Sequence, residues 1–234
     1  MKRYMEIQDS NGNWKYDSVE YPGKLIVLEG MDGTGKSTLT QALSEKLNEL
    51  KTRNNYNIKI TNEPGATAIG KKLKQVINTT TTIDYVTDFL LFAGCRNENI
   101  NKIIKPSLSK GDIIISDRYV YSSLVYQGLM NDDYERIYDV HKKLDLILVP
   151  DILFILTLDP KTALQRISSD DKFEQNNTEY FEKIQNYYVT KSPEWAVDGC
   201  KHYIINCDNK SKEEITSDLL AKILLSCKES SFLL

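Results

Sequence analysis

No uninterrupted apolar run in this sequence approaches the roughly 20 residues that a membrane-spanning helix requires, so we expect no membrane partner. The first residues are polar and contain no apolar stretch of the kind found in secretory signals, so we expect no such signal. Four cysteines are present, without a C-x-x-C pair or a dense framework. This spacing predicts reduced thiols and a cytoplasmic location, with zinc binding or disulfides as the alternative.

Arginine is also scarce. The 234 residues contain 30 lysines and arginines and 33 aspartates and glutamates, for a net charge of −3. This balance predicts no general attraction to nucleic acid or to anionic membranes. Six of the basic residues are arginines, at positions 3, 53, 96, 118, 136 and 166. Because guanidinium groups are so few, their positions are informative.

The length and composition are those of one globular domain. Hydrophobic residues make up 41% and charged residues 27%, which excludes collagenous chains and argues against disordered ones. Residues 1–22 are polar and end in a Tyr-Pro-Gly turn, so we interpret them as a polar extension before a single domain of residues 23–234. Five residues of the extension have the spacing of calcium-loop ligands: Asp9, Asn11, Asn13, Asp17 and Glu20. However, Trp14 stands where such a loop requires glycine, which disfavours calcium binding.

Short apolar runs alternate along the domain with stretches of helical periodicity. The runs predict five strands, within residues 25–28, 58–61, 113–117, 152–158 and 203–205. Helical periodicity occupies stretches that include residues 39–50, 84–109, 131–144 and 178–190. Uninterrupted apolar runs are typical of strands buried on both faces. The alternation therefore predicts an α/β fold, with a five-stranded parallel sheet flanked by helices on both faces.

A phosphate-binding loop follows the first predicted strand. Residues 30–37 read Gly-Met-Asp-Gly-Thr-Gly-Lys-Ser and match G-x-x-x-x-G-K-[ST] between a strand and a helix, which predicts the three-layer P-loop NTPase fold. The glycines allow backbone N–H groups to surround phosphate oxygens, and the helix N-terminus adds its positive dipole end. We expect Lys36 to reach the β- and γ-phosphates and the Ser37 hydroxyl to bind Mg²⁺. The predicted ATP-binding residues are Gly30, Met31, Asp32, Gly33, Thr34, Gly35, Lys36, Ser37 and Thr38.

The phosphate loop does not by itself identify the reaction. A GTP-binding switch would normally contain Asn-Lys-x-Asp for guanine and Asp-x-x-Gly after its third strand, and the sequence has neither. A motor or transporter ATPase would usually be longer or carry a second ATP signature. A kinase that transfers the γ-phosphoryl group to a second substrate is therefore favoured over a nucleotide-dependent switch or scaffold.

Three further segments carry a family pattern. They read Thr-Asn-Glu-Pro-Gly-Ala-Thr at 61–67, Phe-Leu-Leu-Phe-Ala-Gly-Cys-Arg at 89–96, and Asp-Arg-Tyr-Val-Tyr-Ser-Ser-Leu-Val-Tyr-Gln-Gly at 117–128. With the phosphate loop, they resemble the thymidylate kinase family over residues 24 to about 208. The resemblance implies transfer of the ATP γ-phosphoryl group to dTMP, giving dTDP, with Mg²⁺ as cofactor and a homodimer as the assembly. Another nucleoside or nucleoside-monophosphate kinase is the alternative.

The resemblance also assigns an acceptor site. It implies that Phe92 stacks on the pyrimidine, that Arg96 hydrogen-bonds the base, and that Asp32 contacts the sugar 3′-hydroxyl. It places Tyr126 against the 2′ carbon, where its ring would disfavour a ribose. By periodicity alone, Phe92 would be a core residue and Asp32 a turn residue. The other acceptor residues that it implies are Glu63, Pro64, Arg118, Ser122, Ser123 and Gln127.

Asp117 and Arg118 can also be interpreted without the resemblance. Both end the third predicted strand, at the edge where open α/β sheets bind their ligands. A planar guanidinium is suited to bidentate capture of a monophosphate, and a surface ion pair is the alternative for Arg118. We expect Asp117 to orient Mg²⁺ together with Ser37, or to hold Arg118.

The sequence departs from the family pattern in two places. Asn62 stands where many bacterial relatives have arginine. Some relatives place a catalytic arginine inside the phosphate loop, where this chain has Gly33, and others place arginines in a lid after the fourth strand. The corresponding lid is about residues 166–177, in which we predict Arg166 as the main cation and Lys172 as its assistant, with a helix-surface position as the alternative for Arg166. The predicted catalytic residues are Lys36, Arg118, Arg166 and Lys172.

Overall fold

The computed structural model describes residues 2–8, 14–51, 56–80, 83–167, 178–196 and 199–228. Within these residues, a parallel sheet of five strands has the order β4-β5-β3-β6-β7. This sheet confirms the predicted fold class. Its strands are β3 (Lys24–Glu29), β4 (Ile58–Asn62), β5 (Ile113–Asp117), β6 (Ile152–Thr157) and β7 (Lys201–Asn206).

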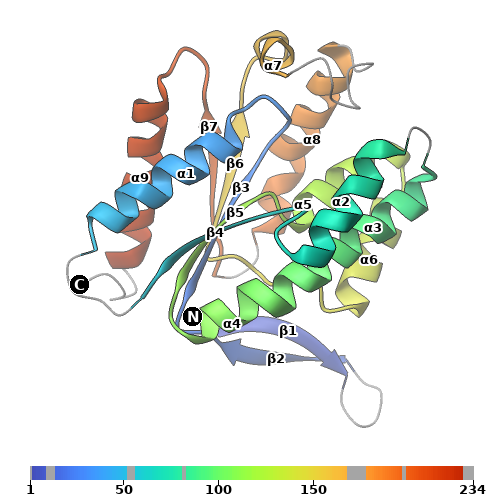
Figure 1. Ribbon diagram of the computed structural model, residues 1–234, viewed down its shortest axis with the longest axis horizontal. Coiled ribbons are helices and arrows are strands. Elements are labelled where there is room, and N and C mark those ends of the chain that lie inside the picture. The colour runs from blue at the N-terminus through green and yellow to red at the C-terminus, as the bar shows by residue number, and fades with distance from the viewer. Residues whose placement is uncertain are drawn as a thin grey trace.

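Helices cover both faces of the sheet (Figure 1). On one face lie α1 (Lys36–Glu49) and α9 (Lys212–Lys228). On the other side lie α2 (Ala68–Thr79), α3 (Tyr85–Asn99), α4 (Lys105–Ser109), α5 (Val120–Ser123), α6 (Tyr134–Lys143) and α8 (Thr178–Trp195). The short α7 (Pro160–Arg166) follows the carboxyl end of β6. None of the helices in the described part of the chain combines the length and apolar character needed to cross a bilayer.

The helical stretch predicted for residues 84–109 is helical throughout but is not one uniform helix. It begins at Asp84, whose carboxylate accepts hydrogen bonds from the N–H groups of Val86 and Thr87 at 3.0 and 3.4 Å. A π-helical turn, Ile100–Ile104, separates α3 from α4. A second π-helical turn, Leu124–Gly128, follows α5 and leads into a 3₁₀ turn, Leu129–Asn131.

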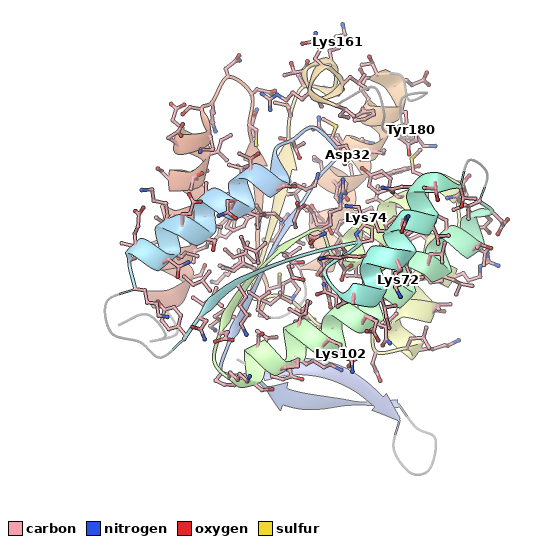
Figure 2. The ribbon with its side chains drawn as sticks, in the orientation of Figure 1. Asp32, Lys72, Lys74, Lys102, Lys161 and Tyr180 are labelled. Atoms are coloured by element: carbon pink, nitrogen blue, oxygen red, sulfur yellow. The ribbon has the colours of Figure 1, made fainter. Side chains whose placement is uncertain are left out.

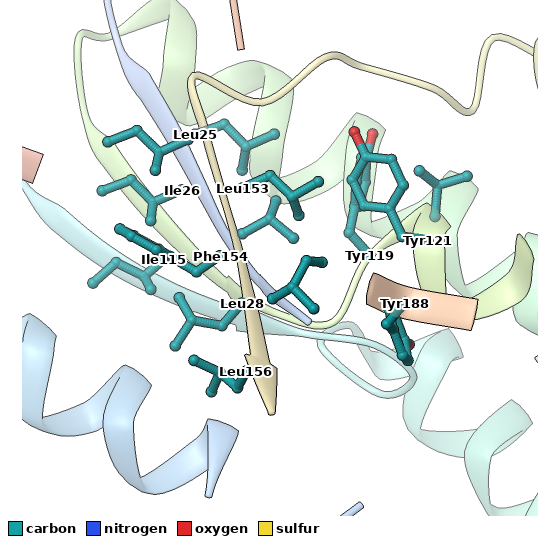
Figure 3. Packing of buried hydrophobic residues seen from close by; sticks show 14 of the residues in the cluster. Leu25, Ile26, Leu28, Ile115, Tyr119, Tyr121, Leu153, Phe154, Leu156 and Tyr188 are labelled. Atoms are coloured by element: carbon teal, nitrogen blue, oxygen red, sulfur yellow. The ribbon is translucent and has the colours of Figure 1, made fainter. Parts of the chain in front are cut away.

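The central strand β3 shows why apolar residues follow one another in the predicted strands without alternating with polar ones. Residues 25–28 of β3 are each at most 1% exposed, because helices pack on both sides of the strand. Figure 3 shows Leu153 and Phe154 of β6 beside these residues, and Tyr119, Tyr121 and Tyr188 continuing the core toward α5 and α8. Tyr121 stacks on Trp195 with ring centroids 5.0 Å apart. The core therefore holds the strand ends that carry the phosphate loop and Arg118.

The polar extension contains a β-hairpin that we did not predict. β1 (Lys2–Gln8) and β2 (Trp14–Glu20) pair antiparallel, from Lys2 opposite Glu20 to Gln8 opposite Trp14. The Asn11-Gly12 pair between two segments of strand length is the signal in the sequence that could have predicted this hairpin. Asp17 and Glu20, two candidate ligands of the disfavoured calcium loop, lie in β2 and not in a loop. The hairpin precedes the amino end of β3, away from the phosphate loop (Figure 1).

Candidate active site

The phosphate loop connects the carboxyl end of β3 to α1. Gly30, Gly33 and Gly35 have φ values of 143°, 81° and 88°, which glycine adopts without the strain that other residues incur. A Cβ atom at Gly33 would lie 2.3 Å from the carbonyl oxygen of Ala163 in α7, so close backbone packing also requires glycine there. At Gly35, the described residues other than its chain neighbours leave the space within 4 Å of a Cβ position empty. The loop is therefore packed against α7 at one glycine and open at another.

Lys36, the first residue of α1, extends back into this loop. Its Nζ donates hydrogen bonds to the carbonyl oxygens of Gly30 at 3.0 Å and Met31 at 2.8 Å, and the residue is 6% exposed. Burial, assisted by the charge of Arg118, lowers the pKa of Lys36 to about 8. A phosphate anion beside the ammonium group would favour its charged form again.

Ser37 and Asp117 meet although they are far apart in the sequence. The Ser37 Oγ donates a hydrogen bond to the Asp117 Oδ2, because β3 and β5 are neighbours and pair Leu28 with Asp117. A hydroxyl and a carboxylate oxygen are the types of ligand that Mg²⁺ takes from proteins, alongside water and phosphate oxygens. The pair therefore fits the predicted magnesium site, and the described residues contain no group of three or more His, Cys, Asp or Glu that could hold a metal.

Arg118 is held against the phosphate loop by its backbone and by its side chain. Its φ of 68° is in the left-handed region, and its N–H donates to the Leu28 carbonyl at 2.9 Å. The guanidinium Nη2 donates to Asp32 Oδ1 at 2.5 Å, and Nη1 donates to Ser122 Oγ at 2.9 Å. Nη1 also lies 3.4 Å from the Gly30 carbonyl oxygen. The cation at the end of β5 thus touches the loop at the end of β3.

The charges of this pair reinforce one another. Burial would raise the pKa of Asp32, but the charges of Arg118 and Lys36 outweigh burial and lower it. For Arg118, burial acts against the charged form, and the Asp32 carboxylate reverses this effect and raises the pKa. The Arg118 Cζ also lies 5.4 Å from the centre of the Tyr126 ring, a cation–π distance. Both Asp32 and Arg118 are therefore ionised at neutral pH.

The π-helical turn after α5 brings consecutive residues to the same site. Tyr126 and Gln127 lie in this turn, and both line the cavity described below. The Gln127 amide donates to Asp88 Oδ2 of α3 at 2.8 Å. Such turns commonly occur at functional sites because they alter which side chains share a helix face.

A cluster of buried polar side chains lies behind Tyr126 and Gln127, which form one wall of the cavity described below. The Arg96 side chain donates from Nε to Glu63 Oε2 at 2.8 Å, and from Nη1 to Ser123 Oγ at 2.9 Å. Its Nη1 is also 2.5 Å from His141 Nε2. The His141 Nδ1 lies 2.7 Å from the Ile137 carbonyl, so Nδ1 carries the proton and Nε2 accepts from Arg96. Burial, then the Arg96 charge, lowers the pKa of His141 to about 3, which keeps the imidazole neutral.

One cavity of about 1180 Å³ extends along the carboxyl ends of the sheet strands. This volume exceeds the usual range for a single small ligand, which favours a site for two substrates. Figure 2 shows three residues that line it from different elements: Asp32 of the phosphate loop, Lys74 of α2 and Tyr180 of α8. The strand order places residues that follow β4 and β5 on one side of the phosphate loop, and residues that follow β6 and β7 on the other.

Most of the predicted site residues line this cavity together. They are Asp32, Gly33, Thr34, Gly35, Lys36, Ser37, Thr38, Glu63, Pro64, Phe92, Asp117, Arg118, Ser122, Tyr126, Gln127 and Arg166. Gly30 and Met31 form the base of the loop and do not line the cavity, and their carbonyls bind Lys36. Arg96 and Ser123 are each 1% exposed and lie behind the wall. Lys172 and most of the lid lie outside the described residues.

Several cavity residues were not predicted. Asp88 precedes Phe92 by one helical turn, so the i, i+4 rule could have found it. Cys207, Lys210 and Lys212 follow the end of β7, where the strand-end rule applies. Lys74 and Tyr180 carry no local signal, because their helices present them to the cavity through packing alone. Burial raises the pKa of Tyr180 to about 12, and the charges of Asp32 and Asp88 add to this shift.

The fold and this site define a class of protein. A parallel sheet whose phosphate loop lies beside a serine–aspartate pair and a partly buried arginine is typical of P-loop nucleotide kinases.

Comparison with known proteins identifies the family within this class. The thymidylate kinase family model matches residues 28–218. The chain is 35% identical over 199 residues to the thymidylate kinase of Wolbachia pipientis, covering 85% of this chain and 98% of that protein. It is 36% identical over 192 residues to the thymidylate kinase of Brachyspira hyodysenteriae, covering 80% and 90%. The crystal structure of thymidylate kinase from Ehrlichia chaffeensis matches with a TM-score of 0.68 and 25% identity, covering 86% of this chain and 98% of that chain. The chain therefore belongs to the thymidylate kinase family.

Proposed function

We propose that this protein transfers the γ-phosphoryl group of ATP to dTMP, releasing ADP and dTDP. The observation that supports this reaction best is the contact between Arg118 and the phosphate loop, through Asp32 at 2.5 Å and Gly30 at 3.4 Å. An acceptor phosphate on the guanidinium would lie next to a donor phosphate on the loop. Phosphoryl transfer requires this proximity, because the two substrates must be aligned before the group moves.

On the donor side, the loop amides and Lys36 bind the β- and γ-phosphates. Ser37 and Asp117 hold Mg²⁺, which supplies charge neutralisation on the phosphate oxygens when it is bound. Arg166, the last residue of α7, lines the same cavity. We assign to it, and to Lys172 of the lid, the stabilisation of charge on the transferred group.

On the acceptor side, Phe92 stacks on the thymine ring and Tyr126 limits the space at the sugar 2′ position. Arg96 bonds to Glu63, Ser123 and the Tyr119 carbonyl, and from this buried position it holds the segments that line the acceptor side in place. Asp32 binds the 3′-hydroxyl. The cavity positions of Phe92, Tyr126 and Asp32 support these roles, whereas Arg96 is 1% exposed and outside the cavity, which supports a role in holding the wall over the direct contact with the base that the resemblance implied.

Lys74 supplies a cation on the acceptor side. A Cβ atom at Gly65 would lie 3.1 Å from Lys74 Cδ and 3.8 Å from Asn62 Nδ2, so both side chains flank the same turn. Both also line the cavity. We propose that the Lys74 ammonium group contributes to binding the dTMP phosphate, in the region where Asn62 lacks a charge.

A panel of acceptors tests the function. ADP release is measured with ATP and Mg²⁺ in the presence of dTMP, dUMP, dCMP, AMP, GMP or thymidine. We expect the largest kcat/KM with dTMP. A preference for another monophosphate would make the protein a different nucleotide kinase, and ATP binding without acceptor-dependent ADP release would identify a nucleotide switch.

We further propose a homodimer, formed through the exposed apolar face of α2 and α3. Ile69 and Val76 lie two turns apart on α2 and are 52% and 47% exposed, and Leu90 of α3 is 55% exposed. Exposed apolar side chains on two helices that pack together are candidates for an interface. Sedimentation of the wild type and of an Ile69→Glu/Leu90→Glu variant tests the assembly, and a monomeric wild type would refute it. We also propose a cytoplasmic location, which suits an ATP-consuming enzyme with buried thiols at Cys95 and Cys207.

A further inference from the structure

Glu29, the last residue of β3, carries a carboxylate that the reaction described above does not use. The residue is 0% exposed. Its Oε1 accepts hydrogen bonds from the backbone N–H groups of Tyr119 at 2.8 Å and Ser122 at 3.1 Å. Its Oε2 accepts from the Ser122 hydroxyl at 2.7 Å and from the Tyr188 hydroxyl at 3.0 Å. Four donors from two distant segments therefore converge on one buried carboxylate.

Three of these four donors belong to the segment that carries Arg118. Tyr119 follows Arg118 directly, and Ser122 lies one helical turn further along. The Ser122 Oγ has two roles, since it donates to Glu29 and accepts from Arg118 Nη1 at 2.9 Å. A continuous chain of hydrogen bonds thus runs from Glu29 through Ser122 to the guanidinium of Arg118, and from there to Asp32.

Burying the Glu29 carboxylate costs desolvation free energy that an apolar side chain at this position would not cost. Burying a carboxylate is unfavourable unless donors compensate for the lost water. Burial raises the pKa of Glu29, and the Arg118 charge followed by the hydrogen bonds opposes that rise. An apolar side chain would fill the same space without this cost, but it could not hold the N–H groups of Tyr119 and Ser122 in place.

We propose that Glu29 is a positioning residue for the acceptor-phosphate site. It fixes the turn after β5 to the strand that enters the phosphate loop, so that the Arg118 guanidinium faces the transferred phosphoryl group. Arg118 has a left-handed φ of 68°, a conformation that persists only where the surroundings hold it. The Glu29 carboxylate is the part of those surroundings that holds Tyr119 and Ser122, the residues that follow Arg118 in the turn. This inference rests on the proposed function, in which Arg118 binds the acceptor phosphate.

Two conservative variants separate positioning from charge. Glu29→Gln keeps the length and one acceptor oxygen, so it can still hold the two N–H groups. Glu29→Asp keeps the charge but is one methylene too short to reach them. We expect Glu29→Asp to lower kcat/KM for dTMP by about 10–100-fold, since small displacements of a reacting geometry have effects of this size. Glu29→Gln should stay within about threefold of the wild type, and the KM for ATP should stay within about twofold in both.

Tyr188→Phe is the matched control, because it removes the α8 hydroxyl from Glu29 Oε2 and from its 3.1 Å contact with Ser122 Oγ, and leaves the N–H groups of Tyr119 and Ser122 bonded to Glu29. It should lower Tm while kcat/KM for dTMP stays within about twofold. If Glu29→Asp fails to fold, Ser122→Ala tests the same chain of hydrogen bonds through its middle link, and it should raise the KM for dTMP and not that for ATP. A folded Glu29→Asp with wild-type dTMP kinetics would overturn the inference, as would a Gln variant worse than the Asp variant. The proposed function fails separately, if the wild type itself shows no dTMP-dependent ADP release.

Discussion

Replacing Arg118 by alanine tests the acceptor-phosphate site directly. The guanidinium can offer two parallel N–H groups to a phosphate, and each charge-assisted hydrogen bond contributes about 1.5–3 kcal/mol. The side chain is 14% exposed, so water would replace part of what is lost, and we expect about 3–4 kcal/mol. This corresponds to a decrease of about 10²–10³-fold in kcat/KM for dTMP. Asp32 would also lose the partner that neutralises it and would repel the incoming phosphate.

The rate of ADP release is measured at saturating ATP while the dTMP concentration is varied. Calorimetry measures ATP binding separately. ATP affinity should change by less than about threefold, because Lys36 and the loop amides remain in place. Arg136→Ala is the control. Arg136 is paired with Asp133 on α6 and its side chain is 56% exposed, so its removal should leave kcat/KM within about twofold.

Normal dTMP phosphorylation by Arg118→Ala would refute the acceptor assignment. An equal loss of ATP and dTMP binding would also contradict it, since Arg118 would then support the phosphate loop as a whole. Arg118→Lys completes the series. It keeps the charge without the bidentate fork and should recover part of the KM effect but little of kcat.

Three further predictions concern other groups. Lys74→Ala should raise the KM for dTMP about tenfold, the effect of one charge-assisted contact, whereas exposed Lys72→Ala on the same helix should change it by less than about twofold. Because the pKa of Lys36 is lowered to about 8, kcat/KM for ATP should fall as the pH rises above that value, and Lys36→Arg should remove this limb of the pH profile. His141 is neutral in the folded protein, with a pKa lowered from 6.5 to about 3, so only the unfolded chain binds its proton as the pH falls below 6.5. Its contribution to the free energy of unfolding should therefore decrease by about 1.5–2 kcal/mol between pH 6.5 and 5. Urea titrations should show this loss in the wild type and not in His141→Gln, and equal pH dependence of the two would contradict it.

The parts of the fold that could be predicted from the sequence are those with a local physical signal. The apolar runs of β3, β5 and β6 indicate strands because burial on both faces leaves no polar positions. The hairpin of β1 and β2 was missed because its strand segments are rich in polar residues and contain no continuous apolar run. The π-helical turns were also missed, since one extra residue in a turn leaves little trace in apolar spacing.

The candidate site divides in the same way. The phosphate loop and the Asp117–Arg118 pair are contiguous motifs, so the sequence was enough to predict them. The partners of these motifs come from distant segments: His141 meets Arg96 across 45 positions, and Tyr188 meets Glu29 across 159. Such contacts depend on how helices pack on the sheet, and neither composition nor spacing encodes them for a single chain.

The contact between Gly33 and Ala163 restricts how this enzyme could evolve. Because the loop and α7 touch backbone to backbone there, a mutation that introduced an arginine at position 33 would have to push α7 away, and Arg166 with it. If Arg166 has the proposed role, an arginine at position 33 would therefore displace the cation that it would replace. The packing at this one glycine thus ties the shape of the phosphate loop to the place of α7 and its last residue, Arg166.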